Sequence, residues 1–481
     1  MKKEINLFQA LIPITALIVM LAYNVLVAYN GAEDNVLGGS NQFVLLLGAT
    51  IAALVGLWVK VSFKEMMEQV FLNIKSTGGA ILILLMVGAL SGTWLVSGII
   101  PAMIYYGLMI LNPTIFLFAC VVICAVISVA TGSSWTTSAT IGIALMGIGQ
   151  ALGIPMGMTA GAIISGGYFG DKMSPMSDTT NLAAAMAGTD LFSHIRYMTL
   201  TTVPTFIITL VIFLLLGFSF SSSDLPDTSA IALAISSKFN ISLWLFVVPA
   251  FILILVLRKI DPLAALMTGT LLGGIFAVIF QPEIVKSITG SAVLDFKAAY
   301  RGVMDAITSP IAIETNNEQL SDLFTSKGMS GMLNTVWLII CAMVFGGVME
   351  AIGALKRITR WLLELFDSVF ALFASTVASC LMINITTSDQ YLSVVVPGKM
   401  FSKTYEKKGL APENLSRTLE DSGTVTSVLV PWNTCAAYNS GVLGVPTLTY
   451  LPYAFFNLIS PFMTLLFAAF KIKIRKLAPA K

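Results

Sequence analysis

The sequence predicts an all-α polytopic membrane protein built from two inverted repeats. Three observations predict this fold class: an apolar composition, a set of internally repeated motifs, and an uneven distribution of lysine and arginine. Of the 481 residues, 57% are hydrophobic and only 11% are charged, and the mean hydropathy is +0.88. Soluble domains contain about 25% charged residues, and the apolar runs of about 20 residues in this chain are long enough to cross a bilayer.

Four short motifs occur in the same order in the first and second parts of the chain. Each match is weak by itself, but the last three pairs share an offset of about 255 residues, which indicates a duplication. The paired motifs are FKEMMEQVFLNI (63–74) with FKAAYRGVMDAI (296–307), SGTWLVSG (91–98) with GGVMEAIG (346–353), TGSSW (131–135) with TTSDQ (386–390), and SPMSDTT (174–180) with VPWNTCA (430–436). We therefore expect a first repeat at 1–220, a connecting segment at 221–240 with its acidic loop 221–227 as the seam, and a second repeat at 241–481.

The placement of lysine and arginine predicts the orientation of the crossings, because cytoplasmic loops carry an excess of these residues. With the N- and C-termini both cytoplasmic, 21 of the 27 lysines and arginines lie inside, five lie outside, and Lys172 lies within the membrane. Each repeat then has five crossings, an odd number, so the repeats are inverted. The expected crossings are 7–29, 42–60, 78–98, 155–190 and 198–218 in the first repeat, and 241–257, 262–281, 331–352, 416–446 and 447–470 in the second.

Each repeat also contains an apolar segment that small polar residues interrupt near its middle. In the segment 113–149 the interruption is TGSSW, and neither apolar piece is a comfortable full span. In the segment 368–400 the interruption is TTSDQ, and several lysines follow. We expect both segments to be re-entrant hairpins, the first entering from outside and the second from the cytoplasm.

The stretch FGDKMSPMSDTTN (169–181) places three ionisable residues and Pro175 inside the expected crossing 155–190. Proline removes a backbone donor and clashes with the preceding turn, so we expect a break there and at Pro431, its match in 416–446. Non-helical backbone persists at membrane depth only where protein buries it or where it lines a watery cavity. Transporters with inverted repeats use such broken helices near the midplane to bind substrates and coupling ions. The alternative for this stretch is an ordinary interfacial loop.

The carboxylates of the broken crossings are the strongest candidates for binding. A charge at the centre of a membrane helix costs roughly 2.5–3.5 kcal/mol, so these groups must be paired, protonated or ion-bound. Desolvation raises the pKa of a carboxylate and a nearby cation lowers it, so one carboxylate holds either a proton or a hard cation such as Na⁺. Asp178 is the first choice for this group. The other oxygen ligands that we expect are Asp171, Ser177, Thr179, Thr180, Asn181, Asp389, Ser388, Asn433, Thr434, Ser133 and Ser134, and the supporting residues are Lys172, Glu420, Asp421, Pro175 and Pro431.

Several charged residues have a second interpretation that the sequence leaves open. Lys172 is either a counter-charge for a carboxylate or a side chain that snorkels to the cytoplasmic surface. Asp389, at the expected tip of the second hairpin, either binds an ion or caps the returning helix. Glu420 and Asp421 begin the second broken crossing, where they either line the site or complement the helix dipole. The single histidine, His194, is expected to be solvated in a cytoplasmic turn.

Three stretches resemble the NhaC-type Na⁺/H⁺ antiporter family of bacteria. They are GGYFGDKMSPMSDTTNLAA (166–184), SKGMSGMLNTVWLIICAMVFGGVMEAIG (326–353) and LEDSGTVTSVLVPWNTC (419–435), and the resemblance covers nearly the whole chain. It implies the fold of the wider ion-transporter group, with two re-entrant hairpins and a moving transport domain. The family also includes a branch that exchanges malate with protons for lactate with Na⁺, and these motifs do not separate that branch from simple antiporters.

We therefore expect a secondary active antiporter that exports Na⁺ in exchange for H⁺ by alternating access. A Na⁺-coupled organic-acid exchanger of the malate–H⁺/lactate–Na⁺ type is the main alternative, and a channel is a more distant one. We do not expect an enzyme, because one histidine and no nucleophile motif leave little for acid–base catalysis. No cofactor is expected beside the transported Na⁺ and H⁺. The expected partners are small ions and the lipid bilayer of the bacterial cytoplasmic membrane, with a homodimer left open, and no nucleic acid.

Overall fold

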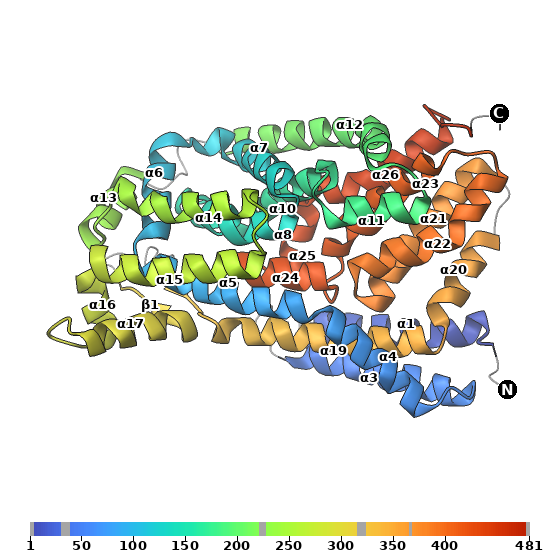
Figure 1. Cartoon of the computed structure of the whole chain (residues 1–481), viewed down its shortest axis with the longest axis horizontal. Coiled ribbons are helices and arrows are strands. Elements are labelled where there is room, and N and C mark those ends of the chain that lie inside the picture. Colours follow the sequence, from blue (N-terminus) through green and yellow to red (C-terminus); the bar gives the residue numbers. More distant parts are fainter. Residues whose placement is uncertain (1–3, 30–38, 221–227, 315–323, 365–367, 478–481) are drawn as a thin grey trace.

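The structure of the chain is a computed structural model that describes residues 4–29, 39–220, 228–314, 324–364 and 368–477. Among these residues, seven helices are long and apolar enough to cross a membrane, or nine if each of two bent helix pairs counts as one span. Most of the long helices run along the long axis of the molecule (Figure 1). The expectation of a polytopic all-α protein is thus confirmed, while the expected seam at 221–227 lies outside the described residues.

The helices before the seam follow the expected crossings closely, with short extra helices between them. They are α1 (Leu7–Tyr23), the π-helical turn η1 (Asn24–Ala28), α3 (Asn41–Trp58), α4 (Phe63–Ser76), α5 (Gly78–Val96), α6 (Ile99–Ile110), α7 (Pro113–Thr131), α8 (Ser134–Thr137), the π-helical turn η3 (Ser138–Gly142), α9 (Ile143–Ala151), α10 (Met156–Met173), α11 (Asp178–Ala187) and α12 (Leu191–Phe218). The helix α12 begins seven residues earlier than the expected crossing, so it also contains His194.

The helices after the seam include two bent pairs and one small β-hairpin. They are α13 (Thr228–Lys238), η4 (Leu243–Phe246), α14 (Val247–Leu257), α15 (Pro262–Phe280), α16 (Pro282–Thr289), α17 (Phe296–Thr308), β1 (Ile311–Ala312), β2 (Thr325–Ser326), η5 (Ser330–Met332), α19 (Leu333–Ala351), α20 (Ala354–Glu364), α21 (Val369–Thr387), α22 (Gln390–Lys407), α23 (Pro412–Leu419), the π-helical turn η6 (Glu420–Thr424), η7 (Ser427–Leu429), α24 (Thr434–Leu443), α25 (Thr447–Tyr450), η8 (Leu451–Tyr453) and α26 (Phe455–Ala469). The strands β1 and β2 pair antiparallel, with Ile311 opposite Ser326. The chain bends by 89° between α13 and the η4–α14 helix and by 55° before α26.

Polar residues at the helix starts explain where many of these helices begin. Asn6 and Ser62 each form a capping box, in which side chain and backbone bond reciprocally across the first turn. Asn112 and Asp261 cap α7 and α15, and both caps precede a proline, which needs no backbone donor at that position. Asp190 accepts a hydrogen bond from the backbone of Ser193 and starts α12.

The two segments that we expected to be hairpins are each interrupted by a short polar connection between two helices. The helix α7 ends at Gly132, which has φ +73°, and α21 ends at Ser388, a non-glycine residue with φ +61°. Both α7 and α21 contain 19 residues and are apolar enough to cross a membrane. The first arm at 113–149 is therefore longer than the short piece that the sequence suggested.

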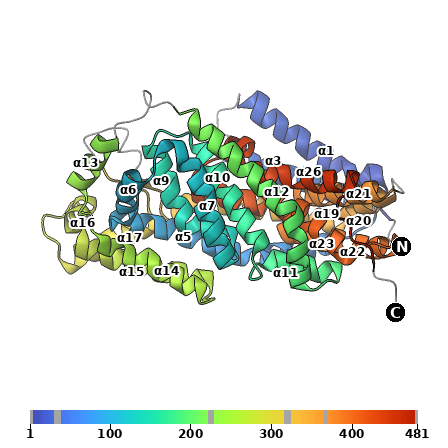
Figure 2. The same cartoon turned by 90° about the horizontal axis from the view of Figure 1, so that it is seen from above.

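The helix interruptions lie around the two prolines. The helix α10 ends at Met173 and α11 begins at Asp178, with Pro175 between them. In the later segment η7 ends at Leu429 and α24 begins at Thr434, so Pro431 also lies in the gap. In Figure 1, α10 and α24 lie in the middle of the molecule, between α12 and α26 on one side and α5 and α19 on the other. The view from above in Figure 2 also places α10 beside α7.

Glycines on α10 allow α7 to approach its backbone closely. A Cβ atom added at Gly166 would lie 2.3 Å from the carbonyl oxygen of Val121, which cannot move without disturbing α7. The Ser128 hydroxyl donates a hydrogen bond of 2.6 Å to the carbonyl of Gly167 across the same interface. Small residues are the usual means by which membrane helices pack without a hydrophobic driving force.

This packing predicts a position-specific sensitivity to added methyl groups. Gly166→Val should separate α7 from α10 and destabilise the protein by about 1–3 kcal/mol, the usual penalty for overpacking. The matched control is Gly167→Ala, because its added Cβ would meet nothing closer than 3.6 Å. Thermal unfolding of the purified protein in detergent should show a lower midpoint for the valine variant alone. Equal midpoints for the two variants would contradict the close approach.

Candidate functional site

Four half-helices begin at the interruptions, and each begins at a polar N-cap that the sequence had marked as a candidate ligand. A helix start leaves backbone N–H groups without partners, and a cap supplies an acceptor for one of them. The caps and the donors that they bind are Ser133 with the backbone of Thr136 (3.1 Å), Ser177 with that of Thr180 (3.4 Å), Asp389 with that of Leu392 (2.8 Å), and Asn433 with that of Cys435 (3.1 Å). The capping role considered for Asp389 is therefore present.

Asp171 joins the first hairpin to the first broken helix. Its carboxylate accepts hydrogen bonds from the backbone N–H of Ser134 (3.2 Å), the hydroxyl of Ser134 (2.7 Å) and the hydroxyl of Ser177 (2.6 Å). The side chain lies at the end of α10, while Ser134 opens α8 and Ser177 caps α11. The carboxylate thus sits at the partial positive charge of helix N-termini, which stabilises its negative charge.

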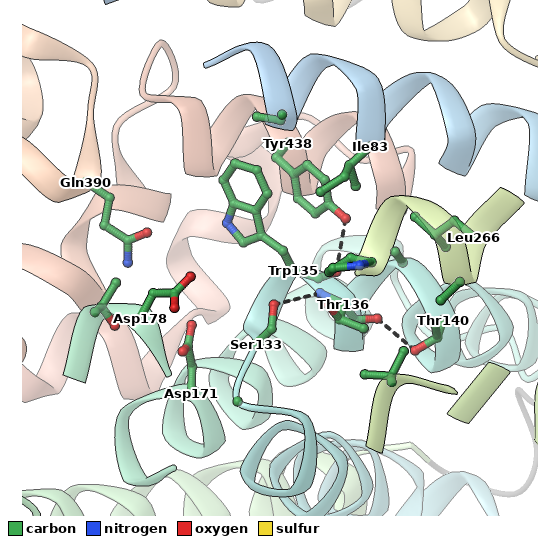
Figure 3. A pocket seen from close by; sticks show the side chains of 18 of the residues that line it. Ile83, Ser133, Trp135, Thr136, Thr140, Asp171, Asp178, Leu266, Gln390 and Tyr438 are labelled. Atoms are coloured by element: carbon green, nitrogen blue, oxygen red, sulfur yellow. Dashed lines mark hydrogen bonds between the residues drawn. The ribbon is translucent and has the colours of Figure 1, made fainter. Parts of the chain in front are cut away.

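Asp178 is the first residue of α11 and faces open space. Its carboxylate is exposed and makes no hydrogen bond or ion pair within the part of the chain that the structure describes. It borders a cavity of about 320 Å³ together with Asp171, which is only 7% exposed. Figure 3 shows both aspartates in this cavity with Ser133 and Gln390. These two aspartates are the charged groups through which the cavity can bind a ligand.

The remaining lining of the cavity comes from both halves of the chain. The polar and aromatic members are Ser76, Ser133, Trp135, Thr136, Thr140, Thr179, Gln390, Tyr391 and Tyr438, and the apolar ones come mainly from α5, α14 and α15 and include Ile83, Ile252, Val256 and Leu266. Within the described residues the lining contains no lysine, arginine or histidine. Groups of three or more His, Cys, Asp or Glu suited to a resident metal are also absent from the described residues. The cavity is therefore an acidic, hydroxyl-rich chamber with one apolar side.

Two of the expected ligands on α11 instead stabilise the break itself. The Thr180 hydroxyl donates to the carbonyl of Lys172 at 3.1 Å, and the Asn181 amide donates to the carbonyls of Ser177 (2.7 Å) and Pro175 (3.0 Å). Because α10 ends at Met173, the carbonyl of Lys172 loses its helical partner, whereas the carbonyl of Ser177 also accepts the backbone N–H of Asn181 at 3.1 Å. Both side chains therefore satisfy freed backbone acceptors, as membrane burial requires.

The expected ligands of the second half lie next to one another but not on the cavity lining. The backbone N–H of Thr434 donates to the carbonyl of Ser388 at 2.9 Å, and the Asn433 amide donates to the side chain of Asn384 at 3.1 Å. Gln390 and Tyr391, which follow the Asp389 cap, line the cavity, whereas Asp389 itself does not. The second half thus repeats the hairpin-to-broken-helix junction without an acidic residue in the position of Asp171.

Sequence reasoning missed the aromatic contact that connects the two halves at the cavity. The rings of Trp135 and Tyr438 stack with centroids 4.1 Å apart, and the Tyr438 hydroxyl donates to the carbonyl of Trp135 at 3.0 Å. Next to this stack, the Ser138 hydroxyl donates to the side-chain oxygen of Asn439, the residue after Tyr438, at 2.8 Å. Each residue is unremarkable in its own segment, so only the fold identifies the pairing.

A second missed feature is a buried ion pair beside the cavity. Lys172 and Asp421 are both fully buried and form a salt bridge, and Ser460 on α26 lies within hydrogen-bonding distance of both. The other carboxylate oxygen of Asp421 accepts hydrogen bonds from Thr201 on α12 (2.8 Å) and from Thr464 on α26. Lys172 therefore acts as a counter-charge, and the alternative that it snorkels to the surface is wrong.

The surroundings of this pair correct two further expectations. Glu420 and Asp421 do not lie in the first turn of their crossing, because α23 begins at Pro412, about two turns earlier. The first-turn dipole explanation for these acids is therefore wrong. His194 is not solvated either: it is fully buried on α12, and neither ring nitrogen has a hydrogen-bond partner in the described part of the chain.

The family model of the Na⁺/H⁺ antiporter family matches residues 166–472, which include both interruptions, the second hairpin and the buried pair. The chain belongs to the Na⁺/H⁺ antiporter family. Among similar proteins, the Na⁺/H⁺ antiporter NhaC of Alkalihalophilus pseudofirmus is 37% identical over 434 residues, 90% of each chain. The NhaC of Bacillus subtilis is 34% identical and covers 88% of this chain and 90% of its own. The malate-2H⁺/Na⁺-lactate antiporter of B. subtilis is 36% identical over 87% of both chains.

These comparisons place this antiporter-family member among transporters rather than enzymes, and they confirm the resemblance seen in the sequence. The matched relatives include both a Na⁺/H⁺ antiporter and an organic-acid exchanger. Membership of the family therefore does not by itself identify the substrate. The residues that line the cavity have to distinguish Na⁺ from an organic acid.

The buried pair predicts a large loss of stability when one partner is neutralised. Asp421→Asn leaves the Lys172 charge buried without its partner, which should cost about 3–5 kcal/mol, whereas Lys172→Met with Asp421→Leu should recover much of that loss. The control is Glu283→Gln, which removes a surface ion pair with Lys286 and should cost at most about 1 kcal/mol. Unfolding in detergent measures all three variants. An Asp421→Asn protein as stable as the control would contradict the pairing.

Proposed function

We propose that this chain is a secondary active antiporter that exports Na⁺ from the cytoplasm in exchange for H⁺. The observation that carries the proposal is the cavity, which two aspartates border and whose described lining contains no basic side chain. The proposal is further supported by membership of the Na⁺/H⁺ antiporter family and by two relatives named as Na⁺/H⁺ antiporters.

In this proposal Na⁺ binds at Asp178, with Asp171 and the hydroxyls of Ser133 and Thr179 as neighbouring oxygens. Oxygen ligands such as carboxylates, hydroxyls and carbonyls suit hard cations. The exposed Asp178 carboxylate has no competing partner in the described residues, so a cation entering the cavity meets an unpaired negative charge. Asp171, held by the serine donors, keeps its position when the ion arrives and leaves.

The transport movement in this proposal follows the inverted-repeat architecture. The repeats are 1–220 and 241–481, and the hairpins and broken helices move relative to the remaining helices so that the cavity opens to one side at a time. The division is supported by the two similar junctions, each with a hairpin tip bonded to a broken helix. The chain enters α1 and leaves α26 at the same end of the long axis, as expected if both termini are cytoplasmic (Figures 1 and 2).

The organic-acid alternative is favoured by one relative but opposed by the lining of the cavity. Carboxylate substrates are bound most strongly by arginine forks or other aimed cationic donors. The basic side chain closest in sequence to the site, Lys172, is fully buried, bonded to Asp421, and not part of the lining. A dicarboxylate in this cavity would instead meet Asp171 and Asp178, which would repel it.

A reconstituted flux assay tests the substrate directly. In proteoliposomes, an imposed Na⁺ gradient should drive proton movement in the absence of any organic acid. Adding malate or lactate should leave this movement unchanged. Proton movement that requires malate or lactate would show that the chain is an organic-acid exchanger, and Na⁺ current without coupled protons would show a channel.

The Na⁺ site is tested by Asp178→Asn, which removes the negative charge but keeps the side-chain shape. This variant should lose all Na⁺-driven proton movement, while size-exclusion behaviour and melting midpoint stay close to those of the wild type. The control is Asp190→Asn, because asparagine caps a helix as well as aspartate does. Wild-type transport by the Asp178→Asn protein would refute the assignment.

A further inference from the structure

Glu420 is a fully buried carboxyl group for which the structure provides no hydrogen-bond partner. The side chain lies in η6 and has no exposed surface, and neither carboxyl oxygen makes a hydrogen bond within the described residues. The Thr424 hydroxyl, one turn further along, interacts with this carboxyl group but makes no hydrogen bond of normal geometry among the described residues. A carboxylate held in this way without donors is strongly disfavoured, whereas the neutral acid is tolerated.

The charges nearest to Glu420 are of both signs. Lys172 on α10 and Asp421, the next residue in η6, both interact with Glu420 electrostatically, as does Asp171. The Asp421 carboxylate already forms an ion pair with Lys172 and accepts hydrogen bonds from two threonine hydroxyls, so it is stable in its ionised form. The group of Lys172, Asp421 and Glu420 is thus neutral when Glu420 carries a proton and has one negative charge when it does not.

Among the other elements packed against this group, α23 contributes one buried cation, Arg417, and α12 contributes the buried His194. The helices α21 and α26 contain no Asp, Glu, Lys, Arg or His at all. Arg417 on α23 is held over the rings of Tyr197, Phe373 and Phe467. On α12, the charges of Lys172 and Asp421 act on His194 electrostatically, and both of its ring nitrogens are unpartnered among the described residues. On α11 and α22, the acids nearest the breaks are Asp178, in the cavity, and Asp389, bound at its cap.

Glu420 lies apart from the cavity but is mechanically connected to it. Neither Glu420, Asp421 nor Lys172 belongs to the cavity lining, whereas Asp171 does. Asp171 and Lys172 are consecutive residues at the end of α10, one bonded to Ser134 and the other to Asp421. A displacement of this helix end therefore changes both places together.

We propose that Glu420 carries the exchanged proton, at a site separate from the Na⁺ site at Asp178 and Asp171. The inference rests on the proposed function. Protonated Glu420 releases H⁺ and becomes a carboxylate when Na⁺ occupies the cavity, because the added positive charge near Asp171 stabilises the new negative charge. Protonation of Glu420 in turn weakens Na⁺ binding by the same factor, since such coupling is reciprocal.

Two models are possible: separate sites for the two ions, or competition of both ions for one carboxylate. They predict different transport activities for the Glu420→Gln protein. Glu420→Gln is a permanent mimic of the protonated acid, so it keeps the Na⁺ ligands, binds Na⁺ more weakly than the wild type and has no proton to exchange. In proteoliposomes at saturating Na⁺ it should still exchange ²²Na⁺ for unlabelled Na⁺, a reaction that moves no proton. Na⁺-driven acidification or alkalinisation should fall to the level of empty liposomes. Asp178→Asn should lose both activities, and Glu406→Gln, a surface glutamate on α22, should keep both.

Each outcome bears on the proposal. Glu420→Gln that still couples Na⁺ to protons would overturn it, and so would a folded Glu420→Gln protein that loses ²²Na⁺ exchange. If Glu420→Gln does not fold, Glu420→Asp is used instead, and it should retain coupled exchange with a displaced pH profile. An unchanged pH profile in that folded variant would also overturn the proposal. A wild-type protein that shows ²²Na⁺ exchange but no coupled proton movement would refute the proposed function itself.

Discussion

The arrangement of the site depends on one constraint: backbone N–H and C=O groups need hydrogen-bond partners where the helices stop inside the membrane. Water is scarce there, so each freed N–H or C=O group requires a partner from the protein. Four polar caps supply the acceptors, the Thr180 hydroxyl donates to the carbonyl of Lys172 at the end of α10, and the Asn181 amide donates to the carbonyl of Pro175 in the gap. The same broken backbone gives Asp171 its serine donors and leaves Asp178 at a helix start facing the cavity. Structure and ligand binding therefore use the same residues.

The buried Lys172–Asp421 pair fixes the position of α10 against the second half of the chain. Burying two charges is expensive unless additional hydrogen bonds satisfy the remaining atoms, and Thr201, Ser460 and Thr464 provide them. These hydroxyls come from α12 and α26, so the pair brings together helices that are far apart in the sequence. A neutral contact of the same size would pack equally well, but it would not respond to a charge that enters or leaves nearby.

The sequence predicted local features well and long-range partners poorly. Prolines indicated the interruptions at Pro175 and Pro431, and small polar residues indicated the hairpin turns, because both act on their own backbone. The partner of Lys172 lies 249 residues away, so no local pattern could choose between a counter-charge and a snorkelling side chain. The burial of His194 was missed for a similar reason: nearby basic residues suggested a cytoplasmic turn, whereas α12 begins before it and turns it toward the protein interior.

If Na⁺ and H⁺ bind at separate sites, the exchange reaction of this antiporter family has a simple physical basis for coupling the two ions. Two ions that share one carboxylate exclude each other by occupancy, but two sites must communicate through charge or movement. The end of α10 provides both routes, because Asp171 contacts the hairpin at the cavity and the next residue contacts Asp421. The helix also stops directly after these residues, so this end can shift without distorting a continuous span. A break placed one turn later would leave both residues within a continuous helix, where neither could shift without distorting the span.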